Sequence, residues 1–174
     1  LSIENHFALE PALTHRLEEL RPHFENQLQS AHFVRARAGF ENWGVHVETG
    51  LSTYIPYSAA SIAAPPPPQA TAGRINRAGV SFLYVASDIE TAIAEVRPHP
   101  GHLVSTGVFT LEATAMIADF SRVALKDFAT SDSALDQFTF LLSSEGHFGG
   151  RVVPDKGKRY LLGHLVADVL RQMG

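Results

Sequence analysis

Hydrophobic side chains in residues 9–28 recur at intervals of three and four positions, which is the period of an α-helix. The stripe consists of Leu13, Leu17, Leu20 and Phe24. Because proline lacks the backbone N–H that an interior helical position uses, Pro11 and Pro22 limit the segment. The pattern predicts two short helices or one kinked helix.

Residues 31–38 show a weak alternation of side chains that predicts a β-strand. Arg35 and Arg37 stand two positions apart, so a strand would place both side chains on the same face. Two interpretations of this pair stay open. The arginines form either a salt-bridging edge or a clamp for an anion.

Residues 40–72 have little hydrophobic periodicity, and residues 65–68 are consecutive prolines. Such a run favours extended polyproline II and excludes helix. We expect a long surface loop, of the kind that is often functional or mobile. A linker between two domains is the alternative.

The stretch from residue 73 to residue 97 reads as a glycine-punctuated loop, a β-branched and aromatic run over residues 80–85 and a short helix. Ser87 and Glu90 fit a capping box at the start of that helix, and Asp88 in its first turn suits the helix dipole. Pro98 disfavours helical geometry in the residue before it, so the helix should end near Val96.

Glu95 would therefore lie in the final helical turn, against the negative end of the dipole. That placement costs roughly 0.3–1 kcal/mol at an exposed site, which suggests a reason other than helix stability. Glu95 would also border the apolar stripe of Ile89, Ala92, Ile93 and Val96. A solvated surface glutamate beside Arg97 is the alternative interpretation.

The C-terminal part alternates strands and helices. It predicts a turn over residues 98–101, strands over residues 102–111 and 116–120, and two helices. Asp132 or Ser133 can cap the first helix, which runs to about residue 145 and buries Leu135, Phe138, Leu141 and Leu142 before the glycines Gly146, Gly149 and Gly150. The second covers residues 160–173, with Gly174 after its end, and buries Leu162, Leu165, Val166, Val169, Leu170 and Met173.

Composition narrows the class of protein. A chain of 174 residues with 45% hydrophobic content predicts one α/β domain with a real core. A net charge of −4 without a Lys/Arg cluster argues against nucleic acid as a partner, and the absence of cysteine excludes disulfides and thiolate chemistry. No apolar run is long enough to cross a membrane, so we expect a cytoplasmic protein. His99 and His102 flank a Pro-Gly turn and lack a suitably spaced carboxylate, so we expect no metal site.

Four segments together resemble the successive motifs of the RES domain family, the toxin halves of bacterial toxin–antitoxin pairs. They are residues 33–37 (FVRAR), 73–79 (GRINRAG), 83–87 (LYVAS) and 90–96 (ETAIAEV). The resemblance covers the chain from about residue 31 onward, which suggests an N-terminal helical extension over residues 1–30 and a RES-like catalytic domain over residues 31–174. It implies an α/β single domain with a small mixed sheet and flanking helices, related to the ADP-ribosyltransferase toxins.

The resemblance also implies an activity: cleavage of NAD⁺ at the nicotinamide–ribose bond, with water, phosphate or a protein as the acceptor. It assigns Glu95, Tyr84 and Arg74 as catalytic residues, and Arg35, Arg74 and Tyr84 as dinucleotide-binding residues. A cognate antitoxin is the implied partner, whereas homo-oligomerisation is left open. Protein ADP-ribosylation at the same site, or an inactive regulatory module, are the alternatives.

The implied chemistry agrees with the residue types. Nicotinamide leaves as a neutral molecule, so the site mainly has to stabilise an oxocarbenium-like ribose, which a carboxylate does electrostatically. Arginine forks match pyrophosphate oxygens.

Two departures from the family pattern stand out. Tyr160 is followed by Leu-Leu-Gly-His164 where the family usually has Thr-Gln, and the family serine in a later strand has no counterpart before Gly174. We therefore expect the natural chain to continue past Gly174 into a strand that bears this serine.

Overall fold

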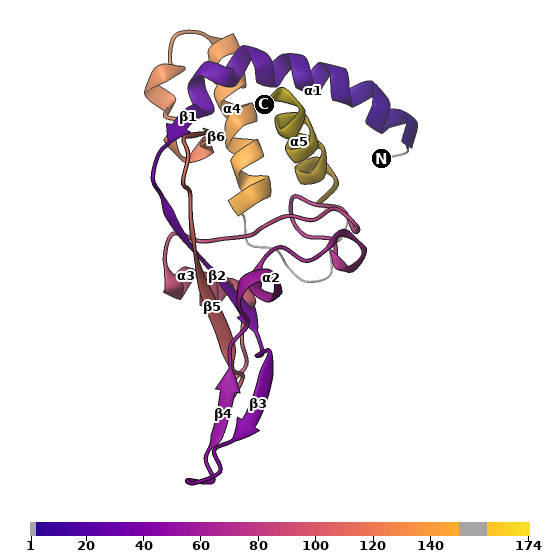
Figure 1. The fold of residues 1–174 in the computed structure, drawn as a ribbon. Helices are drawn as coiled ribbons and strands as arrows, with labels where there is room; N and C mark the ends of the chain where they lie inside the picture. The colour runs from indigo at the N-terminus through magenta and orange to yellow at the C-terminus, as the bar shows by residue number, and fades with distance from the viewer. Residues whose placement is uncertain (1–2, 150–159) are drawn as a thin grey trace. The chain divides into compact units, whose positions relative to one another are not determined.

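The computed structural model describes residues 3–149 and 160–174. Its contacts divide the chain into two compact units that interleave in sequence (Figure 1). The first unit contains Leu1–Leu28, Thr71–Val80 and Ala115–Gly174, and the second contains Gln29–Ala70 and Ser81–Thr114. Helices and small sheets are mixed along the chain, which confirms the predicted α/β class. The expected mixed sheet is instead a set of two-stranded antiparallel pairs within the described residues.

The first unit is mainly helical. Its elements are α1 (Ile3–Phe24), β1 (Glu25–Leu28), β6 (Ala115–Ala118), the 3₁₀ turns η2 (Phe120–Arg122) and η3 (Leu125–Asp127), α4 (Asp132–Gly149) and α5 (Tyr160–Met173). One helix contains both Pro11 and Pro22. The prediction of helix for residues 25–28 is wrong, because these residues pair antiparallel with β6, from Glu25 opposite Ala118 onward. A partner about 90 positions later in the chain overrides the local helical pattern.

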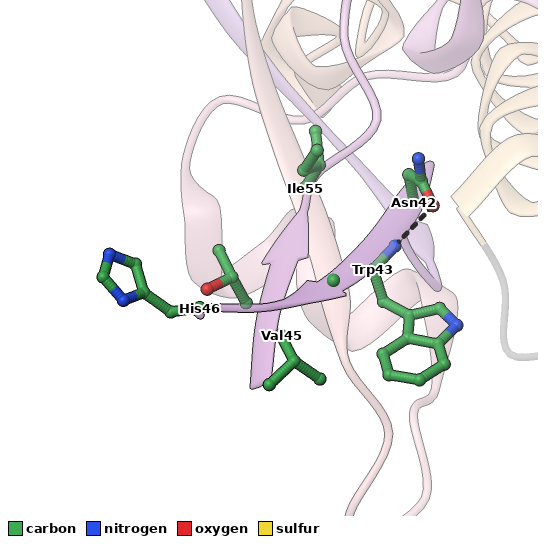
Figure 2. Close-up of a pocket in the computed structure, with 7 residues that line it drawn as sticks. Asn42, Trp43, Val45, His46 and Ile55 are labelled. Carbon is green, nitrogen blue, oxygen red and sulfur yellow. Dashed lines mark hydrogen bonds between the residues drawn. The ribbon is translucent and has the colours of Figure 1, made fainter. Parts of the chain in front are cut away.

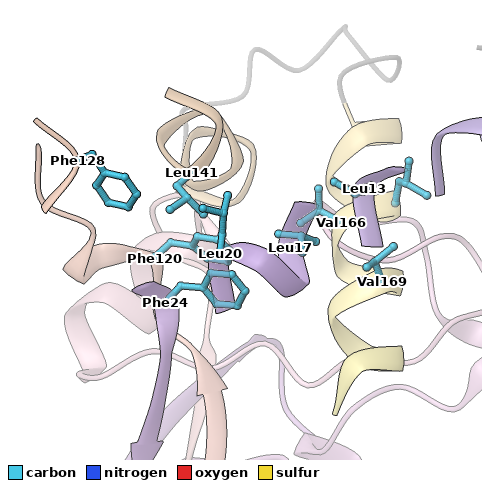
Figure 3. Close-up of a cluster of buried hydrophobic side chains, with 10 residues drawn as sticks. Leu13, Leu17, Leu20, Phe24, Phe120, Phe128, Leu141, Val166 and Val169 are labelled. Carbon is cyan, nitrogen blue, oxygen red and sulfur yellow. The ribbon is translucent and has the colours of Figure 1, made fainter. Parts of the chain in front are cut away.

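The core of the first unit forms where α1, α4 and α5 pack together (Figures 1 and 3). Leu17, Leu141 and Val169 are each 0% exposed. The predicted stripe of α1 is fully confirmed, since all of its members are buried: Leu13, Leu17, Leu20 and Phe24. α1 therefore supplies part of this core, and the domain boundary at residue 30 stays a prediction.

The core-facing sides of α4 and α5 were predicted less accurately. Leu135, Leu142 and Leu162 are 40%, 42% and 39% exposed, so their predicted burial is wrong. Ser131 caps α4, because its Oγ accepts the N–H of Ala134 at 3.2 Å, one residue before the predicted capping pair. The helix continues to Gly149, beyond its predicted end near residue 145, whereas Gly150 lies outside the described residues.

The second unit is built on an antiparallel ribbon of β2 (His32–Ala38) and β5 (Val104–Thr110), in which Arg35 lies opposite Gly107. Both strands were predicted. Figure 1 also shows α3 (Ile89–Val96) beside this ribbon and the hairpin of β3 (Asn42–Val45) and β4 (Ser52–Ile55). The remaining elements are α2 (Ala59–Ile62) and the 3₁₀ turn η1 (Pro67–Gln69).

The β3–β4 hairpin corrects the prediction of an unstructured loop over residues 40–72. Trp43 pairs with Tyr54 across the hairpin, and aromatic cross-strand pairs of this kind stabilise sheets. Gly50 has a φ of +67°, which a glycine adopts without steric cost in the turn. Pro66 has the expected polyproline II geometry, at φ −61° and ψ 148°. The prediction that the proline run excludes helix is wrong, because the run continues into η1, a 3₁₀ turn.

The segment before α3 is extended but is not a strand. Residues 80–85 pair with no strand among the described residues, and only Ala86 forms a bridge, to Val34, with reciprocal backbone hydrogen bonds of 2.8 Å. This β-branched and aromatic run therefore does not form a strand. The predicted capping box at Ser87 is wrong, because Asp88 is the N-cap and its carboxylate accepts the Thr91 N–H at 2.7 Å. The predicted end at Val96 is confirmed, with Arg97 in the left-handed region at φ 50°.

Candidate functional site

Arg35 and Tyr84 meet in the second unit. The bridge between Val34 and Ala86 holds the extended segment along β2, one residue from Arg35 and two from Tyr84. The Nη1 of Arg35 donates a hydrogen bond to the main-chain carbonyl of Tyr84 at 3.2 Å. This contact fixes the guanidinium against the backbone of the segment, while the Tyr84 residue stays 43% exposed.

The guanidinium of Arg35 has an unusual environment. Its Nε is buried and has no hydrogen-bond partner among the described residues. Burial lowers the pKa of Arg35 first, and the like charge of Arg37 lowers it further. Buried polar groups in folded proteins nearly always have a partner, so this N–H is a candidate donor to a bound anion.

Arg37 is the second cation on this face of β2, and neighbouring residues hold its side chain in place. Its guanidinium carbon lies 4.0 Å from the centre of the Tyr57 ring, and its Nη1 donates to the carbonyl of Ser61. Within the described residues, neither Arg35 nor Arg37 forms an ion pair with a carboxylate. The interpretation of the pair as a salt-bridging edge is therefore wrong for this part of the chain, whereas the anion clamp stays a prediction.

Glu95 lies in the last turn of α3, as predicted, and its side chain is exposed. α3 packs against β2 in the same unit, with Ala92 as its buried residue. The Glu95 carboxylate makes no hydrogen bond or ion pair with any residue that the structure describes. A side chain in this setting is accessible to a substrate, and the catalytic role of Glu95 stays a prediction.

Arg74 belongs to the first unit. Its Nη1 donates to the carbonyl of Phe148 near the end of α4, at 2.8 Å. The predicted site residues are thus distributed between both units, since Arg35, Tyr84 and Glu95 belong to the second. Convergence of Arg35 and Arg74 on one anion stays a prediction.

Two buried polar residues beside Arg74 were not predicted as site residues. Asn76 is 4% exposed, and the Nε2 of His164, which is 7% exposed, lies 2.7 Å from the carbonyl oxygen of Gly73. The sequence contained one signal for His164, namely its place where the family pattern has a different residue. Nothing in the pattern around Asn76 distinguishes it from an ordinary loop asparagine.

The comparison with protein families matches the RES domain model to residues 43–174, about three quarters of the chain. The chain belongs to the RES domain family. No curated protein and no solved structure matches it. The match to the RES domain includes Arg74, Tyr84 and Glu95, whereas Arg35 lies before its first residue. The family is linked to NAD-processing enzymes.

A hollow of about 280 Å³ lies on the β3–β4 hairpin of this RES domain and contains none of the predicted site residues (Figure 2). Its lining residues are Asn42, Trp43, Gly44, Val45, His46, Thr53 and Ile55. None of them is a lysine or an arginine, so the hollow offers no permanent cation to a pyrophosphate. The arginines are therefore better suited to the dinucleotide than this hollow.

Membrane spans and metal clusters are both absent from the part of the RES domain that the structure describes. No helix there is both long and apolar enough to cross a membrane. No group of three or more histidine, cysteine, aspartate or glutamate side chains there could hold a metal ion.

Proposed function

We propose that this RES domain consumes NAD⁺ by cleaving the nicotinamide–ribose bond, as the toxin component of a toxin–antitoxin pair. The observation that supports this best is the buried, unpartnered Nε of Arg35, next to the segment that contains Tyr84. A guanidinium held by one N–H, with another N–H buried and unused among the described residues, is suited to a phosphate oxygen. Family membership supports the general class, and the substrate and reaction are proposed.

In the proposed reaction, Arg35 and Arg74 bind the pyrophosphate, and Tyr84 lies against the nicotinamide or ribose. The bond between C1′ and the nicotinamide nitrogen breaks, and both electrons leave with the nicotinamide, which becomes neutral. The Glu95 carboxylate stabilises the ribosyl cation that remains. A water oxygen, or a phosphate oxygen, then bonds to C1′, and water loses its extra proton to the solvent.

Protein ADP-ribosylation at the same residues is the second candidate. Tyr84 is 43% exposed and Glu95 is also exposed, so a protein side chain could reach them as the acceptor. The chemistry before the acceptor step is identical. The two candidates therefore differ in where the ADP-ribose ends and not in whether nicotinamide is released.

The test is to incubate the purified protein with NAD⁺ and to quantify nicotinamide, ADP-ribose and ADP-ribose phosphate. The reactions are run with and without phosphate and with and without a cell extract freed of small molecules. We expect nicotinamide release in every case. Label on protein would favour ADP-ribosylation, and no nicotinamide under any condition would contradict the proposal and favour an inactive module.

The proposed antitoxin partner has its own test. Expression of the chain alone should slow bacterial growth and lower the cellular NAD⁺ level, and a cognate antitoxin should reverse both effects. Growth arrest at an unchanged NAD⁺ level would contradict the proposed mode of action.

A further inference from the structure

A hydrogen bond from α5 to Gly73, the residue before Arg74, attaches this helix to the loop that contains Arg74. The Nε2 of His164 lies 2.7 Å from the carbonyl oxygen of Gly73. A carbonyl oxygen can only accept, so the imidazole donates, and it can do so in its neutral or its protonated form. The imidazole is almost fully buried, which shields this bond from competition with water.

This hydrogen bond acts on the peptide group that leads into Arg74. The carbonyl of Gly73 and the N–H of Arg74 belong to one planar unit. Fixing the direction of the carbonyl therefore also fixes the direction from which the Arg74 backbone starts. Glycine has more backbone freedom than any other residue type, so the hydrogen bond from His164 has a large effect on the conformation of Gly73.

The rest of the loop is restrained from within. The Nδ2 of buried Asn76 lies 2.9, 3.1 and 2.9 Å from the carbonyl oxygens of Thr71, Arg77 and Val80. The N–H of Gly73 in turn donates to the carbonyl of Asn76 at 2.9 Å. These bonds close the loop on itself, but they do not attach it to a helix.

A second contact attaches the loop to α5 one helical turn further on. The Oδ2 of Asp168 forms an ion pair with Nη2 of Arg77 at 2.9 Å, and Asp168 follows His164 by four positions on the same helix face. Arg77 is nearly half-exposed, so solvent weakens this ion pair. The buried bond from His164 is therefore the stronger of the two attachments.

We propose that His164 is a positioning residue for Arg74: its hydrogen bond to Gly73 orients the arginine that binds the dinucleotide. The inference rests on the proposed function, because it takes Arg74 to contact NAD⁺. Arg74 uses one N–H on the carbonyl of Phe148, and a guanidinium has several more to offer a phosphate. With both the start of its backbone and one end of its guanidinium held, Arg74 would meet the substrate without a large loss of side-chain entropy.

A matched pair of amide variants tests this role. In His164→Gln the amide nitrogen can reach about the position of Nε2, whereas in His164→Asn it falls short of Gly73. We expect His164→Asn to raise the KM for NAD⁺ about tenfold, because Arg74 is no longer held in the orientation that binds the substrate, with kcat within about twofold. His164→Gln should restore KM to within about threefold of the parent. Gln172→Leu, which removes an exposed contact of α5 to Glu10, is the control and should leave both constants unchanged.

Hydrogen exchange of the amides in residues 73–80, measured without NAD⁺, provides a readout that does not depend on turnover. We expect faster exchange there in His164→Asn than in the parent, with exchange in the core of α1 unchanged. A folded His164→Asn variant with the parent KM would overturn the positioning role while leaving the proposed function intact. A parent protein that neither binds nor cleaves NAD⁺ would instead overturn the proposed function and this role with it.

Discussion

Arg35 donates a hydrogen bond to the main-chain carbonyl of Tyr84, across 49 positions of the sequence, at 3.2 Å. The bond leaves the buried Nε of Arg35 without a partner among the described residues. Since the acceptor is a backbone atom, substitutions of the Tyr84 side chain should not disturb the guanidinium. Arg35 and the ring of Tyr84 can therefore be tested independently.

Arg35→Lys should weaken NAD⁺ binding although it keeps the positive charge. An ammonium is a compact point charge, so lysine cannot bond the Tyr84 carbonyl and fork onto a phosphate at once. We expect KM to rise about tenfold or more, as for the loss of one charge-assisted hydrogen bond. Steady-state kinetics of nicotinamide release would measure it, with Arg122→Lys, a substitution in η2, as the control. A KM equal to that of the parent would remove Arg35 from the site.

Arg35 and Arg74 should be energetically coupled in substrate binding if they bind one pyrophosphate. A double-mutant cycle with Arg35→Lys and Arg74→Lys would measure this from the KM or Kd for NAD⁺. Residues that share a ligand group typically show coupling energies of about 0.5–3 kcal/mol, whereas independent sites add within about 0.5 kcal/mol. Strict additivity would show that the two arginines do not share an anion.

Glu95→Gln should abolish most of the turnover while preserving the fold. The amide keeps the shape of the side chain but lacks the charge that would stabilise the ribosyl cation. Removing one preorganised electrostatic group typically lowers the rate by about 10²–10³-fold. Stability should change little, because a carboxylate at the negative end of a helix dipole contributes none.

Glu90→Gln is the matched control for that experiment, since Glu90 is an exposed glutamate in the first turn of the same helix. It should leave nicotinamide release unchanged. Cleavage of NAD⁺ at the parent rate by Glu95→Gln would mean that Glu95 is a solvated surface residue.

Asp88→Ala should lower the melting temperature at neutral pH by removing the N-cap of α3. Asp88 accepts the Thr91 N–H at 2.7 Å and the Thr91 hydroxyl at 2.9 Å. The backbone hydrogen bond from Thr91 is the main cause that lowers the pKa of Asp88. A depressed pKa means that this stabilisation is present above the ordinary aspartate pKa of about 3.9 and is lost as the pH falls through the folded-state value.

Thermal unfolding at pH 7 and at pH 3 would check the sign of this effect. The difference between parent and Asp88→Ala should shrink at pH 3, and Asp88→Asn, which keeps an acceptor oxygen, should lie closer to the parent at pH 7. An equal difference at both pH values would show that the charge of Asp88 does not matter to the cap.

Leu141→Ala should destabilise the first unit by about 2–5 kcal/mol, because it opens a cavity at a residue that is 0% exposed. Leu142→Ala, one position further along α4 at 42% exposure, should cost much less. Chemical denaturation of both variants would measure the two values. Similar costs for the two substitutions would contradict the burial of α4 described above.

Local chemistry alone determined several features of this protein. Pro98 disfavours right-handed helical geometry at Arg97, so α3 ends at Val96 and Glu95 lies in its last turn. The amphipathic period of residues 160–173 reproduces the bounds of α5. These features depend on contacts within a few residues, and the sequence displays such contacts directly.

Tertiary contacts decided the rest. Residues 25–28 leave the helical pattern because β6 supplies strand hydrogen bonds from far along the chain. Residues 80–85 join no strand among the described residues, and only Ala86, which follows them, forms a bridge. The roles of Arg35 and His164 depend on which carbonyl lies within reach, that of Tyr84 or that of Gly73. A residue type specifies what a side chain can donate, but only the folded chain determines what it meets and whether water is excluded from that contact.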